Sequence, residues 1–145
     1  MYKYSDYNII IFDLGDVIIN INPPATFFAL QDLFQKEISP EDLRFEDFEK
    51  GLFTEQEYLE FLKSKFGNFN DDDFYKAWNV MLLDIPPYRI EIIKELKKSH
   101  NVFLLSNTNS THIQNISNTL KNQFNTSFEE LFDKIFFSYE MKMRK

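Results

Sequence analysis

The sequence predicts an α/β protein, in which a parallel sheet is interrupted by an inserted segment that is entirely helical. The sheet is predicted by three short apolar runs that each end at a polar residue, at 8–12, 101–105 and 134–137. Helical periodicity between the last two runs favours a parallel βαβ unit. The insert is predicted at 20–84, where several helix-start signals occur without a strand-like run.

Composition narrows the class of function. The 145 residues are 43% hydrophobic, which allows one ordinary domain or a core with a modest insertion. The 16 basic and 23 acidic residues give a net charge of -7 without a dense Lys/Arg cluster, so we expect no nucleic-acid or membrane partner. The chain has no cysteine, and no apolar stretch approaches the roughly 18 residues of a spanning helix. We therefore expect a cytoplasmic protein with a small-molecule substrate, and the sequence does not predict its oligomeric state.

The first predicted strand is Asn8–Phe12 (NIIIF). Its apolar residues are continuous rather than alternating, which is typical of a strand buried on both faces of a parallel sheet. Asp13-Leu14-Gly15 follows the run, so we expect the chain to leave the sheet at Asp13.

The insert at 20–84 is expected to form three or four short helices that pack against the core. Pro23-Pro24 precedes an apolar-periodic stretch, and capping boxes begin at Ser39 and Thr54. Three aspartates follow Asn70, and acidic side chains suit the first turn of a helix because they complement its dipole. We interpret the aromatic residues of this segment as core rather than as substrate contacts.

The remaining elements follow in order. Pro86-Pro87 opens a predicted helix that ends near Lys98, and the strand at 101–105 (NVFLL) comes next. A crossover helix is predicted within 111–132 and leads to the strand at 134–137 (KIFF). The crossover helix is predicted from apolar residues at helical spacing, which are Ile113, Ile116, Leu120 and Phe124.

Polar residues follow all three predicted strands. Ligands of doubly wound sheets collect beyond the carboxyl ends of the strands, so we expect these residues to converge. Asp13 would direct a carboxylate there, and Gly15 would let the backbone approach a metal or phosphate closely. Ser106 and Asn107 would offer a hydroxyl and N–H groups to an anion just before a helix. Lys145 would add a positive charge.

Three segments resemble motifs I, II and III of the haloacid dehalogenase-like (HAD) hydrolase superfamily: 9–19 (IIIFDLGDVII), 102–109 (VFLLSNTN) and 141–145 (MKMRK). The first motif is similar to the FDLG-x-V phosphatase group, in subfamily IA with a helical C1 cap. The resemblance implies a HAD-like Rossmannoid parallel sheet. It also implies that the sheet is incomplete, with about three strands present.

The resemblance divides the chain into a core, 1–19 and 85–145, and a cap, 20–84. It places the acidic motif IV, which carries a metal ligand, after Lys145. We therefore expect the chain to be truncated after motif III, with weak or no activity. The first strand is then expected to form an unpaired edge of the sheet.

The resemblance also implies a function: Mg²⁺-dependent hydrolysis of a phosphomonoester of a small metabolite, such as a sugar phosphate. Asp13 would form an aspartyl-phosphate, which divides a hard displacement into two easier ones. Lys145 would be the second catalytic residue, neutralising the nucleophile and the phosphate. Ser106 and the Asn107 amide would bind the transferring oxygens. The Asp13 carboxylate and the Gly15 carbonyl would hold Mg²⁺.

One departure from the family pattern concerns acid–base catalysis. Gly15 stands where most family phosphatases carry an aspartate that protonates the leaving alcohol. Asp16 is a candidate substitute, and a solvated turn residue is the other interpretation. His112 we interpret as a residue of the surface or of a helix cap.

Two other functions stay open. One is a non-catalytic phosphate-binding or interaction module, a pseudo-phosphatase that has lost its acid and motif IV. The other is a metal-independent dehalogenase. Gly15 and the lack of a nearby arginine in the first loop count against the dehalogenase.

Overall fold

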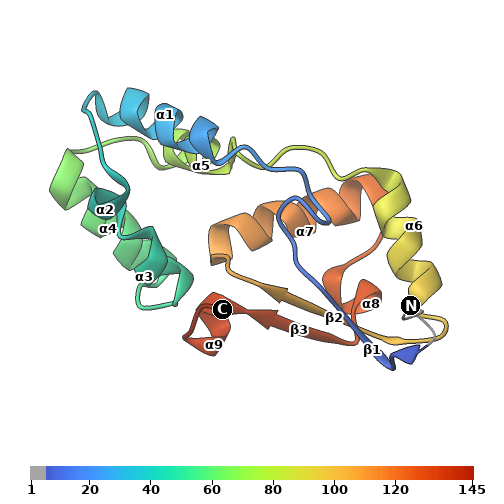
Figure 1. Cartoon of the computed structure of the whole chain (residues 1–145). Coiled ribbons are helices and arrows are strands. Elements are labelled where there is room, and N and C mark those ends of the chain that lie inside the picture. Colours follow the sequence, from blue (N-terminus) through green and yellow to red (C-terminus); the bar gives the residue numbers. More distant parts are fainter. Residues whose placement is uncertain (1–5) are drawn as a thin grey trace.

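A three-stranded parallel sheet organises one half of the molecule in the computed structural model, which describes residues 6–145 (Figure 1). The strands are β1 (Ile9–Phe12), β2 (Asn101–Ser106) and β3 (Lys134–Phe137), and their spatial order is β1-β2-β3. The three predicted strands are therefore confirmed, and their carboxyl ends lie at the same edge of the sheet.

Helices α6 (Pro87–Leu96), α7 (Ser110–Phe124) and α8 (Phe128–Leu131) pack on one face of the sheet. The β2 side chains on this face, Val102 and Leu104, are fully buried. They share one hydrophobic core with apolar residues of all three helices, among them Ile90, Ile93, Ile113, Ile116, Leu120, Phe128 and Leu131. The predicted crossover helix is thus two helices, because Asn125 takes a left-handed conformation (φ 48°) and ends α7.

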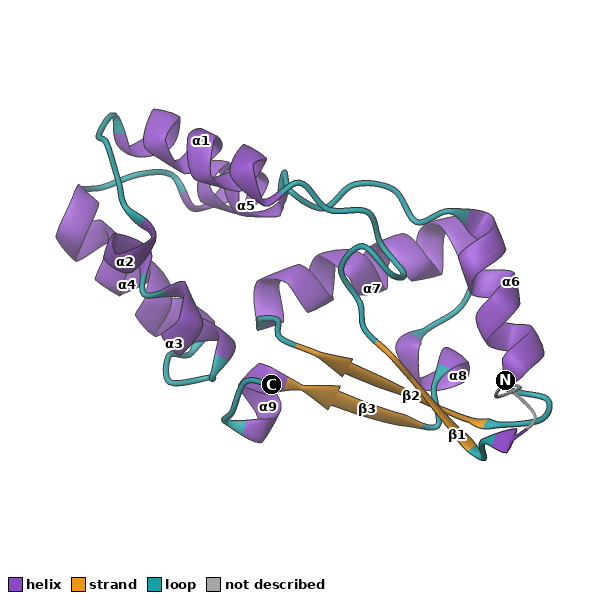
Figure 2. Cartoon of the chain, viewed as in Figure 1, coloured by secondary structure: helices purple, strands orange, loops and turns teal. Residues whose placement is uncertain are grey.

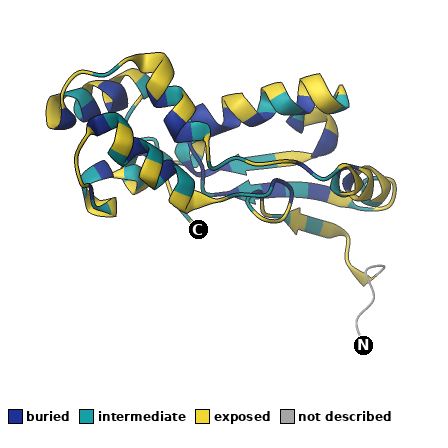
Figure 3. Cartoon of the chain, turned by 90° about the horizontal axis from the view of Figure 1, so that it is seen from above, coloured by how far each residue is buried: buried dark blue, intermediate teal, exposed yellow. Residues whose placement is uncertain are grey.

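Strand β1 is not buried on both faces, so that prediction was wrong. Ile9 is 47% and Ile11 is 59% exposed, as Figure 3 shows for the strand next to the N-terminus. The cause is its position: among the described residues β1 pairs with β2 alone, and Ile11 is in register with Phe103 on the face opposite the three helices. β1 is therefore the expected edge strand.

The other half of the molecule consists of helices from the insert (Figure 2). They are α1 (Pro23–Phe34), α2 (Pro40–Leu43), α3 (Phe45–Glu49), α4 (Glu55–Phe66) and α5 (Asp71–Asn79). They enclose a separate, aromatic-rich core that includes Leu30, Phe34, Phe48, Tyr58, Leu62, Phe74 and Trp78.

The predicted helix starts of the insert are confirmed, but the number of helices was underestimated. Ser39 and Thr54 form complete capping boxes, and the Asn70 side chain caps α5. The unpredicted helix is α3, which is separated from α2 by Arg44 in a left-handed conformation (φ 46°). Nothing in the polar pattern of 40–49 marks that break, so five helices occur where three or four were expected.

The insert meets the sheet half where its connecting segments leave and return, where α5 packs against α7, and at the far side of the insert. The chain segments that lead into and out of the insert run side by side, since Leu83 N donates to Asn20 O (2.9 Å) and Asn22 N to Met81 O (2.8 Å). At the far side, α3 packs against α9 (Ser138–Met141), which follows β3. No helix of the described residues is long and apolar enough to cross a membrane.

Candidate active site

Asp13 and Lys145 form an ion pair beyond the carboxyl ends of the strands. The Lys145 Nζ lies 2.8 Å from Asp13 Oδ2, and it also donates to the Leu105 carbonyl oxygen at 3.1 Å. The other carboxylate oxygen of Asp13 accepts from Leu14 N at 2.7 Å. The structure thus brings together two predicted site residues that are 132 positions apart in the chain. The side chains remain 46% (Asp13) and 37% (Lys145) exposed, so a ligand can reach them.

The side chain of Asn107 holds the backbone of Lys145. Its Oδ1 accepts from Lys145 N at 2.9 Å, and its Nδ2 lies 3.5 Å from Lys145 O. The resemblance to the HAD motifs implied a phosphate-binding role for the Asn107 amide. The structure adds a positioning contact, because the Asn107 side chain fixes the residue that pairs with Asp13.

Ser106 ends β2 and is 4% exposed. Its Oγ donates to the Asn107 carbonyl oxygen at 3.3 Å. The next residue, Thr108, makes a reciprocal pair with Ser138: Thr108 N donates to Ser138 Oγ (2.9 Å), which donates to Thr108 O (3.0 Å). This buried pair ties the end of β2 to the start of α9, and so to the segment that carries Lys145. Ser138 is the polar residue that ends the third predicted strand, but no role was predicted for it.

Gly15 and Asp16 lie in the tight turn that follows β1. A Cβ at Gly15 would stand 2.8 Å from the Ile21 Cδ1, so the missing side chain leaves room for Ile21. Asp16 is left-handed (φ 58°), and its carboxylate accepts from Ile21 N at 3.1 Å. This geometry supports the interpretation of Asp16 as a turn residue.

The turn leaves the carbonyl oxygen of Gly15 without a backbone hydrogen bond from the described residues. The N–H groups of the turn donate to the Leu14 and Ile19 oxygens instead. The Asp13 carboxylate and the Gly15 carbonyl are thus two oxygen donors of the kind that hard cations prefer. No group of three or more His, Cys, Asp or Glu side chains that could hold a metal occurs in the described chain.

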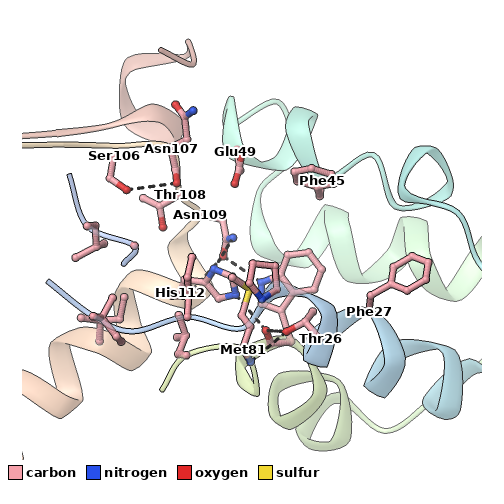
Figure 4. A pocket seen from close by; sticks show the side chains of 18 of the residues that line it. Thr26, Phe27, Phe45, Glu49, Met81, Ser106, Asn107, Thr108, Asn109 and His112 are labelled. Carbon is pink, nitrogen blue, oxygen red and sulfur yellow. Dashed lines mark hydrogen bonds between the residues drawn. The ribbon is translucent and has the colours of Figure 1, made fainter. Parts of the chain in front are cut away.

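A cavity of about 490 Å³ begins at this strand end and extends between the sheet half and the insert (Figure 4). From the sheet half it is lined by Leu14, Gly15, Ile19, Ser106, Asn107, Thr108, Asn109, His112 and Ile116. From the insert and its connections it is lined by Ile21, Pro23, Pro24, Thr26, Phe27, Pro40, Leu43, Phe45, Glu49, Trp78, Met81 and Leu82. Most of these side chains are apolar.

His112 is a buried link between α7 and α5, which corrects its interpretation as a surface residue, while its backbone N–H takes part in the α7 cap by donating to Asn109 Oδ1 at 3.0 Å. Its ring stacks on Trp78, with ring centroids 5.6 Å apart, and its Nε2 lies 3.1 Å from Trp78 O. Burial lowers the pKa of His112 to about 4. At neutral pH the ring is therefore uncharged, and it donates from Nε2 because a carbonyl oxygen only accepts.

The chain's relatives are found through structure. No protein-family model and no curated protein matches the chain by sequence. A HAD family enzyme from Bacteroides thetaiotaomicron, solved as an aspartate-to-alanine mutant in complex with magnesium and inorganic phosphate, is 30% identical over 95% of this chain and 71% of that chain, with a TM-score of 0.87. The chain belongs to the HAD family.

Two further HAD structures agree. The magnesium complex of the Bacteroides thetaiotaomicron enzyme is 34% identical, covers 95% of this chain and 70% of that chain, and has a TM-score of 0.85. A predicted HAD-like family hydrolase from Porphyromonas gingivalis is 26% identical, covers 95% and 69% of the two chains, and has a TM-score of 0.83. The expected HAD-like fold is confirmed, and the chain is placed among the enzymes of this family.

Proposed function

We propose that this HAD chain is a Mg²⁺-dependent phosphomonoester hydrolase that acts on a small metabolite, with Asp13 as its nucleophile. The observation that carries the proposal is the 2.8 Å pair of Asp13 and Lys145 at the carboxyl edge of the sheet, where Lys145 is also held by the Asn107 side chain and by the carbonyl oxygen of Leu105, the residue before Ser106. The complexes of the Bacteroides thetaiotaomicron enzyme with magnesium and inorganic phosphate support it.

In the proposed reaction, an Asp13 carboxylate oxygen attacks phosphorus and the bond from phosphorus to the alcohol oxygen breaks. The departing alkoxide takes a proton from water. A second water then attacks the aspartyl-phosphate, which releases inorganic phosphate and restores the Asp13 carboxylate. Lys145 offsets the negative charge that gathers as nucleophile and phosphate meet. The Ser106 hydroxyl and the Asn107 amide bind the transferring oxygens.

The residues at the strand end fit a magnesium ion in part. Mg²⁺ is usually held in phosphoryl-transfer sites by one or two carboxylates together with substrate phosphate and water. Asp13 would supply the carboxylate, and Gly15 would supply a carbonyl oxygen that no backbone N–H occupies. When bound, the ion polarises the phosphoryl oxygens. Division of the chain into a core, 1–19 and 85–145, and a cap, 20–84, belongs to the same proposal.

Gly15 stands in the place of the usual general acid, so the rate of hydrolysis should depend strongly on the leaving group. A positioned acid contributes about 10²–10⁴-fold when the leaving alcohol needs a proton. The Asp16 carboxylate instead accepts a hydrogen bond from Ile21 N within the turn. We therefore expect good leaving groups, such as acetate or p-nitrophenolate, to depart faster than simple alcohols.

Release of inorganic phosphate from acetyl phosphate tests this function. We expect weak release that requires Mg²⁺, stops with EDTA and is lost in Asp13→Asn, whose fold is checked by circular dichroism. Release at an equal rate in Asp13→Asn would contradict the proposal. Binding of inorganic phosphate without any release would instead favour the non-catalytic module, and activity on haloacids that survives EDTA would favour a dehalogenase.

A further inference from the structure

We infer that the cavity beside the strand end takes an apolar alcohol portion, so that the substrate is the phosphate monoester of an alkyl or aryl alcohol rather than of a sugar. The inference rests on the proposed function, because it assumes that the phosphoryl group binds near Ser106 and Asn107. It narrows the expected class of substrate, which included sugar phosphates.

The cavity borders the proposed phosphoryl site, because Gly15, Ser106 and Asn107 line it, whereas Asp13 and Lys145 lie outside its lining. Figure 4 shows the two labelled side chains Ser106 and Asn107 close together at the strand end. From there it extends to Phe27 and Phe45 of the insert, which Figure 4 shows on the opposite side. An alcohol joined to a phosphoryl group at the strand end therefore enters this space. About 490 Å³ accommodates a ring or a medium-length alkyl chain.

Polar side chains deeper in the cavity are already bonded to one another. Thr26 Oγ1 donates to Trp78 O at 2.8 Å and accepts from Met81 N at 3.3 Å. Asn109 Oδ1 accepts from Trp78 Nε1 (3.2 Å) and from His112 N (3.0 Å). His112 Nδ1 lies 3.2 Å from Asn109 Nδ2, and its Nε2 contacts Trp78 O. These groups hold the insert against the sheet half and have little capacity left for a ligand.

A sugar is poorly matched to such a lining. Each of its hydroxyls leaves water on binding and needs a new partner, and a buried hydroxyl without one weakens binding by roughly tenfold. An alkyl or aryl group needs no partner and gains from contact with Phe27, Phe45 and the proline rings.

Glu49 adds a charge criterion. It contributes a carboxylate to the lining, and that carboxylate lies 2.8 Å from Arg144 Nε, an ion pair without good hydrogen-bond geometry. A second anionic group on the alcohol would approach this carboxylate in a partly dry space.

Trp78 offers a direct readout because it is the only tryptophan of the chain and lines the cavity. We propose to titrate the Asp13→Asn variant with Mg²⁺ and hexyl phosphate, phenyl phosphate, glucose 6-phosphate or inorganic phosphate, and to follow its fluorescence. Hexyl and phenyl phosphate are expected to bind at least roughly tenfold more tightly than glucose 6-phosphate, and inorganic phosphate should displace them. Equal or tighter binding of glucose 6-phosphate would overturn the inference.

A matched pair of variants locates the binding. Phe27 lines the cavity, whereas its neighbour Phe28 does not and is 66% exposed. Phe27→Ser should weaken the binding of hexyl phosphate by roughly fivefold or more without changing the binding of inorganic phosphate. Phe28→Ser should change neither affinity. An equal effect of the two variants would contradict the inference. The comparison of ligands needs neither variant, so it decides the question even where Phe27→Ser does not fold.

The outcomes separate the two proposals. Hydrolysis of acetyl phosphate together with preferred binding of glucose 6-phosphate would overturn the inference and leave the proposed function standing. Failure to hydrolyse acetyl phosphate and to bind inorganic phosphate would remove the proposed function itself.

Discussion

Asp16, a residue of the first motif, stabilises the turn that follows β1. It takes the left-handed conformation at the turn after β1, and its carboxylate accepts from the Ile21 amide at 3.1 Å. Asparagine keeps both properties, since it tolerates this conformation and has a carbonyl oxygen in its side chain. Alanine keeps neither.

We therefore predict that Asp16→Asn alters kcat by less than about threefold, whereas a general acid would lose roughly 10²–10⁴-fold. Asp16→Ala should lower the free energy of unfolding by about 1–2 kcal/mol, because it loses the hydrogen bond and retains the strained conformation. Steady-state kinetics and urea unfolding of the two variants test this. A hundredfold loss of kcat in Asp16→Asn would show that Asp16 is the missing acid.

Between elements, His112 joins α7 to α5 in its uncharged form. Burial lowers its pKa in the folded state to about 4, from the ordinary value of 6.5. The unfolded chain binds a proton more readily, so this contribution is complete above pH 6.5 and is lost as the pH falls towards 4.

Stability of the chain should accordingly fall by roughly 3 kcal/mol between pH 6.5 and 4 on account of His112. Urea unfolding at several pH values measures the fall, and His112→Gln provides the comparison because glutamine does not titrate. The variant should lose stability less steeply over this window. Parallel pH profiles for the two proteins would refute the assignment.

Arg144 connects the segment that carries Lys145 to the insert. Its guanidinium contacts Glu46 at 2.9 Å and Glu49 at 2.8 Å, and the neighbouring Lys142 Nζ donates to Gly51 O at 2.7 Å. Burial raises the pKa of Glu49, and the Arg144 charge opposes that rise. Loss of Arg144 would leave a largely buried carboxylate without its partner.

Arg144→Ala should therefore destabilise the chain by about 1–3 kcal/mol and loosen α3 from α9. Lys98→Ala is the matched control, because its pair with Glu95 is more than two-thirds exposed on both sides and should contribute little to stability. Urea unfolding gives the free energies, and hydrogen exchange of the 45–51 amides reports the docking. Equal effects of the two substitutions would contradict the role of Arg144.

Across the whole molecule, the β1 edge of the sheet is exposed. Ile9 and Ile11 are exposed on β1, and within residues 6–145 this strand pairs with β2 alone. An exposed apolar edge strand is a template for pairing with another chain. We expect concentration-dependent self-association at this edge.

Ile11→Lys should reduce that association, because a charged side chain on an edge strand opposes edge-to-edge pairing. The folded monomer should lose little stability, since Ile11 is already 59% exposed. Sedimentation velocity over a range of concentrations measures the effect. Val17→Lys, at an apolar residue 42% exposed outside the strand, is the control and should leave association unchanged.

The sequence predicted this architecture where local signals suffice. Apolar runs gave the three strands, and capping boxes gave the helix starts at Ser39 and Thr54. It was wrong about the burial of β1, because burial depends on which elements cover a face and not on the run itself. The order of the three motifs in the sequence predicted that Asp13 and Lys145 lie at one site. The sequence missed Glu49, Thr26 and the burial of His112, which become neighbours only when the insert folds onto the sheet half.

The central claim is that Asp13 receives the phosphoryl group. Acid quenching of the chain during turnover of acetyl phosphate with Mg²⁺, followed by peptide mass spectrometry, locates that group directly. We predict a phosphoryl group on Asp13 and none in Asp13→Asn. A phosphoryl group on another residue, or phosphate release with no labelled peptide at any quench time, would contradict the account.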